Sequence, residues 1–209
     1  MRLGRSGKLR PSPFFSYCLT GAIRLKDDRT RMLKTFNPKQ IRIVNDSTSM
    51  AEELVSNAYK LSASEWLARR YDIKTLADLS PDEVIHGPFA QIIRYQGQRA
   101  DTSLSSASYD LYKICFQDHT ILSELAKSPD LKLFPFALYI VTHELVHIVR
   151  FTKFMQNFVS TAEEKMEEEM RVHKKTHEIL GATPLDSLSS VLDFYSQWRT
   201  YHDGSPATP

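Results

Sequence analysis

Residues 141–149 read Val-Thr-His-Glu-Leu-Val-His-Ile-Val, which places His-Glu-x-x-His inside an apolar, helix-forming run. An α-helix turns by about 100° per residue, so residues four apart lie nearly one above the other. His143 and His147 therefore project from one face and can hold one divalent metal ion. Glu144 lies about a quarter-turn away, where it reaches water held by the metal rather than the metal itself.

The chemistry of these three residues favours a zinc site. Two neutral imidazoles suit zinc, and an adjacent carboxylate suits removal of a proton from water. The alternative is a buried amphipathic helix that merely happens to carry two histidines and a glutamate. Such a helix would leave several buried polar groups in need of partners, so we favour a metal site.

The segment resembles the zinc-binding helix of the zincin metallopeptidases, over about ten residues. Apart from the glutamate, that pattern has uncharged residues between the histidines and apolar residues on both sides, matched here by Ile140, Val141, Leu145, Val146, Ile148 and Val149. The resemblance implies an α+β, mostly helical, zincin-like domain with a small antiparallel sheet beside the metal helix. It also implies a zinc-dependent hydrolase of peptides or proteins with Glu144 as general base.

A catalytic zinc usually has three protein ligands, so a third must come from elsewhere in the chain. The metzincin pattern is excluded, because Arg150 stands where its glycine belongs and Lys153 where its third histidine belongs. In the gluzincin pattern the third ligand is a glutamate on a following helix. The next predicted helix after the motif helix, residues 162–180, is rich in glutamate.

Helical geometry ranks these glutamates. With Met166 taken as the centre of the buried face, Glu169 lies about 60° to one side and Glu163 about 60° to the other. Glu167 has the spacing of thermolysin-like members but faces sideways, and Glu168 is expected to point outward into solvent. We therefore expect Glu169 to be the third metal ligand, with the other three as alternatives.

His173 lies four residues after Glu169 on the same predicted face. We expect it to be a fourth metal ligand, a hydrogen-bond partner that orients a ligand, or a catalytic donor to the transition state. The family pattern has an acidic residue at this position, so the histidine is a departure. Tyr95, Tyr112 and His177 are further candidates for stabilising an oxyanion.

Composition indicates an ordinary globular protein with a basic start. The 209 residues are 42% hydrophobic and 25% charged, with a net charge of +2. Residues 1–34 contain nine Lys or Arg against two Asp, and the remainder is mildly acidic. We expect a basic flexible leader over residues 1–35, the zincin-like domain over 36–182, and a C-terminal tail over 183–209 with one short helix. Nucleic acid is not an expected partner.

The pattern of apolar and turn-forming residues predicts the remaining elements. Expected strands are Ile41–Val44, Ile92–Tyr95 and Tyr109–Phe116, the last two forming an antiparallel pair. Expected helices are Met50–Tyr71, a short piece after Pro81, Thr120–Ala126, a metal helix running from near Phe134 toward Phe158, and a piece within Leu188–Trp198.

Cysteine content and hydropathy bear on the compartment. Cys18 and Cys115 are the only cysteines, so no disulfide framework is indicated and a reducing, cytoplasmic setting fits better. We identify no apolar run long enough to span a bilayer. We therefore expect the protein to be located in the cytoplasm.

Two other functions use the same residues. In the first, Glu144 and His147 belong to a di-iron carboxylate bundle, with Glu52, Glu53 or Glu65 from the first helix and Glu169 and His173 from the last. In the second, the metal only stabilises a binding module, and His143, His147, Glu169 and His173 form a closed site without an open position. The expected cofactor is one zinc ion, with iron as the alternative.

Overall fold

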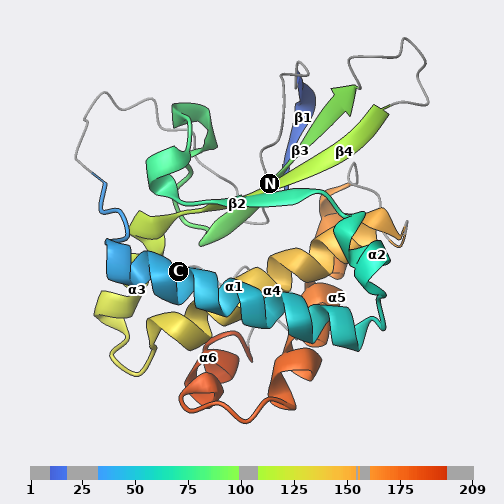
Figure 1. Cartoon of the computed structure of the whole chain (residues 1–209). Helices are drawn as coiled ribbons and strands as arrows, with labels where there is room; N and C mark the ends of the chain where they lie inside the picture. Colours follow the sequence, from blue (N-terminus) through green and yellow to red (C-terminus); the bar gives the residue numbers. More distant parts are fainter. Residues whose placement is uncertain (1–9, 18–32, 99–107, 154, 156–160, 197–209) are drawn as a thin grey trace. The chain divides into compact units, whose positions relative to one another are not determined.

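The computed structural model of the chain describes residues 10–17, 33–98, 108–153, 155 and 161–196 (Figure 1). Its helices are α1 (Pro38–Ala58), α2 (Ala63–Leu67), α3 (Asp118–Lys127), α4 (Leu133–Thr152), α5 (Ala162–Gly181) and α6 (Leu188–Phe194). Its strands are β1 (Arg10–Tyr17), β2 (Tyr71–Lys74), β3 (Ala90–Gln98) and β4 (Ser108–Phe116), with single 3₁₀ turns η1 (Leu76–Asp78) and η2 (Pro81–Glu83). The described part is mostly helical with one small sheet, in agreement with the expected α+β class.

The chain divides into two compact units. Unit 1 comprises Met1–Phe36 and Ser62–Leu122, and unit 2 comprises Asn37–Leu61 and Ser123–Pro209. The domain expected over residues 36–182 therefore spans parts of both units. The sheet belongs to unit 1, and α1, α4, α5 and α6 belong to unit 2.

The sheet of unit 1 has the strand order β1-β3-β4-β2. The antiparallel pairing of β3 with β4 was expected and is confirmed, with Ile92 opposite Ile114. Two strands differ from expectation. β2 lies where we expected the end of a helix and pairs parallel to β4, so the sheet is mixed rather than antiparallel. β1 lies within the expected flexible leader and pairs with β3, whereas residues 1–9 and 18–32 lie outside the described residues.

Glu83 organises the connection that leads into β3. Its buried carboxylate accepts hydrogen bonds from Tyr95 Oη at 2.7 Å, from Lys113 Nζ at 2.6 Å and from the Ser80 backbone N–H at 2.9 Å. Burial by itself raises the pKa of Glu83, but these partners more than offset it and lower the pKa to about 2. The ionised carboxylate thus joins η2 to both central strands.

Helix α1 begins earlier than the sequence indicated. The side chain of Asn37 accepts from the backbone N–H groups of Lys39 and Gln40, each at 3.0 Å, and Gln40 Oε1 accepts from the Asn37 N–H at 2.9 Å. Pro38 occupies the first turn, where its missing N–H costs nothing. The expected strand Ile41–Val44 is therefore wrong, because this capping box starts a helix ahead of it.

Helix α1 also ends earlier than expected. It stops at Ala58, and Lys60 adopts a left-handed backbone with φ of 51°. The expected helix to Tyr71 is therefore broken into α1, the five-residue α2 and strand β2. Leu67, the last residue of α2, is 80% exposed.

Helix α4 carries the His-Glu-x-x-His motif and forms the centre of unit 2. It packs against α1, α5 and α6, and Figure 1 shows α1 and α4 running side by side. By length and composition it passes as a membrane span, contrary to our expectation, but 78% of its most apolar window is buried as in a core helix. It ends at Thr152 rather than near Phe158, and residues 156–160 lie outside the described residues.

The C-terminal tail contributes to this packing. Helix α6 buries Leu188 and Val191 and is followed by the buried Tyr195, whose ring stacks on that of Tyr139 of α4 at 3.9 Å between centroids. The described part of the expected tail is thus packed against α4. Residues 197–209 lie outside the described residues.

Candidate metal centre

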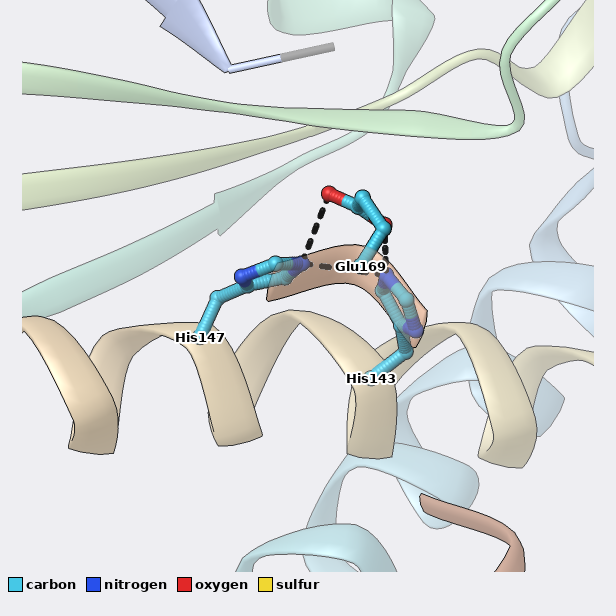
Figure 2. Close-up of side chains that lie close together, drawn as sticks. All are labelled: His143, His147 and Glu169. Atoms are coloured by element: carbon cyan, nitrogen blue, oxygen red, sulfur yellow. Dashed lines mark hydrogen bonds and ion pairs between the residues drawn. The ribbon is translucent and has the colours of Figure 1, made fainter. Parts of the chain in front are cut away.

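His143 and His147 lie one helical turn apart on α4 and point to the same side (Figure 2). Their Nε2 atoms are 3.1 Å apart, so the two rings offer their lone pairs to a common point. The side chain of His147 is 2% exposed and that of His143 is 12% exposed. Helix geometry alone predicted this arrangement, since a spacing of four residues places side chains in one row.

Glu169 reaches the same point from α5. Its Oε2 lies 3.2 Å from His143 Nε2, and its Oε1 lies 3.1 Å from His147 Nε2. Figure 2 shows the carboxylate directed at both rings. The three side chains offer ligand atoms that all lie within 4.8 Å of one another. Glu169 was the glutamate that the helical geometry favoured.

These separations fit one tetrahedral metal ion. Zinc binds histidine nitrogen and carboxylate oxygen at about 2.0–2.2 Å, which places neighbouring ligand atoms about 3.3 Å apart. The separation of the two Nε2 atoms, and that of each Nε2 from its nearer Glu169 oxygen, is 3.1–3.2 Å, which is close to that value. The residues present therefore fit a metal held by two imidazoles and one carboxylate.

The charges of the three residues are strongly coupled. Burial by itself raises the pKa of Glu169, but His147 and His143 more than offset it and lower the pKa. Burial lowers the pKa of His143, against the opposing effect of Glu169. Burial also acts to lower the pKa of His147, yet Glu169 and then Glu144 raise it. The Glu169 carboxylate thus acts to raise the pKa of both imidazoles, although burial prevails at His143.

Glu144 follows His143 on α4 and is not one of the three converging side chains. Burial raises the pKa of Glu144 to about 8, and Glu169 adds to this shift while His147 opposes it. A carboxyl group with a pKa near neutrality suits proton transfer, because it can both accept and release a proton.

Arg150 explains why the glutamate next to Glu169 does not enter the centre. Glu168 is buried, contrary to our expectation that it points into solvent, and it accepts hydrogen bonds from Arg150 Nε and from Nη2 at 2.8 Å. A buried carboxylate needs a charged partner, and Arg150 on α4 supplies it. Glu168 therefore joins α5 to α4 beside the three converging side chains.

The other glutamates of α5 lie away from the centre. Glu163 is exposed, and Glu167 is exposed and pairs with Arg171 at 2.8 Å. Met166, which we took as the centre of the buried face, is 38% exposed. The buried face instead consists of Glu168, Glu169, Val172, His173, Thr176, Ile179 and Leu180. We therefore centred the predicted buried face of α5 on the wrong residue. The preference for Glu169 nevertheless agrees with the structure.

His173 lies beside the centre without joining its three ligand atoms. Its Nδ1 is 2.9 Å from the hydroxyl of Tyr139, and its ring centroid is 4.3 Å from that of His143. The buried Nδ1 of His143 has no hydrogen-bond partner among the described residues. Of the roles expected for His173, this placement favours support of the His143 ring over direct metal binding.

Sequence reasoning missed Tyr139 and Tyr195. Tyr139 precedes His143 by one helical turn, so the helical spacing that found the histidines could also have found it. Tyr195 belongs to the C-terminal region and carries no local signal of its position. Burial raises the pKa of Tyr195, with further contributions from Tyr139 and Glu144.

The alternatives find less support in the described residues. Glu52 and Glu53 of α1 and Glu65 of α2 do not join the converging group, and the described chain holds no second group of this kind. The part of the chain that the structure describes therefore shows no second set of ligands for a di-iron centre. Tyr95, a candidate oxyanion donor, instead donates to Glu83 within unit 1.

Comparisons of the chain with protein-family models, with curated proteins and with solved structures find no match.

Proposed function

We propose that this chain is a zinc-dependent hydrolase of the zincin type that cleaves amide bonds in peptides or proteins. The observation that carries the proposal is the convergence of His143, His147 and Glu169, two from the motif helix and one from the next described helix. The same three types of ligand, in this order along the chain, belong to the gluzincin pattern that the sequence resembles.

Three protein ligands favour a catalytic site over a structural one. Structural zinc sites are closed by four protein ligands, whereas catalytic sites keep one position open for water and substrate. His173 does not join the group, and its Nδ1 lies near the Tyr139 hydroxyl. A zinc ion bound here would supply a Lewis acid that polarises the substrate carbonyl and makes bound water more acidic.

Glu144 is the proposed general base. It lies within the motif helix next to a ligand histidine, and burial raises its pKa to about 8. A nearby divalent cation favours the ionised form of a carboxyl group, so this glutamate would accept a proton from water at neutral pH. It would then return the proton to the leaving amine.

Further parts of the proposal concern setting and substrate. The proposed compartment is the cytoplasm, because the sequence has few cysteines. The proposed partner is a peptide or protein substrate, as the zincin resemblance implies. One zinc ion is proposed as the cofactor.

Replacement of Glu144 by Gln tests the proposal. The zinc-loaded chain is assayed on a library of quenched fluorescent peptides and on denatured casein. We expect Glu144→Gln to lose at least about a hundredfold in cleavage rate, which is the scale of general-base catalysis, while it keeps its zinc. Glu163→Gln, an exposed glutamate of α5, is the matched control and should keep full activity. Absence of cleavage by the wild-type chain, or full activity of Glu144→Gln, would overturn the proposal.

A further inference from the structure

Unit 1 contains a second pair of converging histidines, far from the first in sequence. His86 lies between η2 and β3, and His119 is the second residue of α3. The Nε2 of His119 is 3.2 Å from the Nδ1 of His86, and the rings meet edge to face with centroids 5.0 Å apart. His86 is exposed and His119 is half-buried.

The backbone on both sides of this pair is held in place. The Ile85 N–H donates to the side-chain oxygen of Gln117 at 3.1 Å, and the Gln117 N–H donates to the Phe89 carbonyl at 2.9 Å. These bonds fix the segment that carries His86 against the residue that precedes α3. The two histidines are therefore brought together by a built framework rather than by one flexible loop.

Asp118 fixes the other side of the pair. It directly precedes His119 and is fully buried. Its carboxylate accepts the backbone N–H groups of Phe36 at 2.9 Å and of Leu76 at 3.0 Å. The start of α3 is thus anchored to two separate segments of unit 1, which limits the movement of the His119 ring.

The separation of the two nitrogens suits a shared ion. Two imidazoles on one tetrahedral zinc lie about 3.3 Å apart, and the pair His143 and His147 in the same chain shows 3.1 Å. A neutral hydrogen bond between two rings also fits 3.2 Å, although that value is at the long end of the range for N–H donors. The separation thus fits either a shared metal ion or a hydrogen bond between the rings, and addition of metal distinguishes the two.

We propose that His86 and His119 form a second metal site, which takes one borderline divalent ion such as Zn²⁺ or Cu²⁺. Imidazole nitrogens select these ions over Mg²⁺ and Ca²⁺, which prefer oxygen ligands. No third His, Cys, Asp or Glu of the described chain joins the pair, so solvent completes the coordination. The site is therefore weaker and faster to exchange than the three-residue centre of unit 2.

Histidine ring signals in nitrogen-15 NMR test this site with Zn²⁺ itself as the probe. The full chain is stripped of metal with a chelator and titrated with zinc. We expect the ring nitrogens of His86 and His119 to shift together at a higher zinc concentration than those of His143 and His147. His86→Ala should weaken the zinc response of His119 by at least about tenfold, and His177→Ala on α5 should leave it unchanged.

Two results would overturn the second site. One is that the His86 and His119 signals do not move with several equivalents of zinc. The other is that His119 responds equally well in the His86→Ala variant. Both readouts are independent of the unit 2 centre, so they remain interpretable if His143 and His147 prove not to bind zinc. His86 is exposed, so its replacement by Ala leaves the buried anchors Gln117 and Asp118 intact.

Discussion

Arg150 of α4 donates two hydrogen bonds to the buried carboxylate of Glu168 on α5. Burial raises the pKa of Tyr59 at the end of α1, and the Arg150 guanidinium opposes this rise. Glu168 immediately precedes Glu169, so this ion pair fixes the rotation of α5 at the point where Glu169 faces the two histidines. One turn of helix thus carries a structural carboxylate and a candidate metal ligand side by side.

Arg150→Ala should therefore weaken both stability and metal binding. Removal of the guanidinium leaves a buried carboxylate without its main partner, which costs about 3 kcal/mol of unfolding free energy. The freed α5 would also hold Glu169 less well, with a loss of about tenfold in zinc affinity. Urea denaturation of the metal-free chain and competitive zinc titration measure the two effects separately.

Arg171 provides the matched control, because it contacts the same carboxylate from the solvent side. It lies 3.5 Å from Glu168 and 2.8 Å from Glu167, and its side chain is 58% exposed. Arg171→Ala should cost less than about 1 kcal/mol and leave zinc affinity unchanged. Equal losses in the two arginine variants would contradict the role of Arg150.

Replacement of each α5 glutamate by Gln should single out one metal ligand. Glu169→Gln is expected to lower zinc affinity by more than about a hundredfold, beyond what loss of a supporting residue costs. Glu163→Gln and Glu167→Gln, both exposed, should have no effect. Glu168→Gln should lower zinc affinity modestly and the free energy of unfolding substantially. Isothermal titration with zinc measures the affinity of each variant. A larger loss of zinc affinity in Glu168→Gln than in Glu169→Gln would reverse the assignment of the metal ligand.

Tyr139→Phe tests whether the Tyr139 hydroxyl holds His173 in place beside the centre. The change removes only the hydroxyl that lies 2.9 Å from His173 Nδ1, and loss of this buried bond should cost about 1 to 3 kcal/mol. A double-mutant cycle with His173→Leu separates this bond from the rest of the packing, and we expect a coupling of about 1 kcal/mol. Zero coupling would mean that the two side chains act independently.

Glu83 makes unit 1 sensitive to acid. Its folded-state pKa is lowered from 4.5 to about 2, so its stabilising effect is present above pH 4.5 and is lost as pH falls toward 2. Glu83→Gln should cost about 3 kcal/mol at neutral pH and progressively less in that acidic window. Hydrogen exchange of β3 and β4 amides at several pH values measures this, and a cost that does not vary with pH would exclude the carboxylate charge as its source.

The sequence predicted most of the centre because its signals are local. His143, His147 and Glu144 follow from one helical turn. Glu169 was chosen correctly although the buried face of α5 had been centred on Met166, which is 38% exposed. Glu168 was misjudged because its partner Arg150 lies 18 residues earlier on another helix. Glu168 lies in a run of three glutamates, so it resembles a solvated residue until that partner is placed beside it.

The fold was predicted less completely, for physical reasons of the same kind. The β3–β4 pair was found because both strands carry strong β-forming residues. The strand expected at Ile41–Val44 failed because Asn37 caps a helix ahead of it, and local helix capping overrides a short alternating pattern. Strands β1 and β2 depend on pairing with distant partners, which no local pattern encodes.

X-ray absorption at the zinc edge of the metal-loaded chain tests the unit 2 centre most directly. Loading with one equivalent of zinc and comparison with His143→Ala assign the signal to this site. We predict four nitrogen or oxygen ligands at about 2.0–2.1 Å, two of them imidazoles, with one position filled by solvent. A site with three or four imidazoles, an absence of zinc binding, or a native centre that contains two irons would contradict a catalytic zinc held by His143, His147 and Glu169.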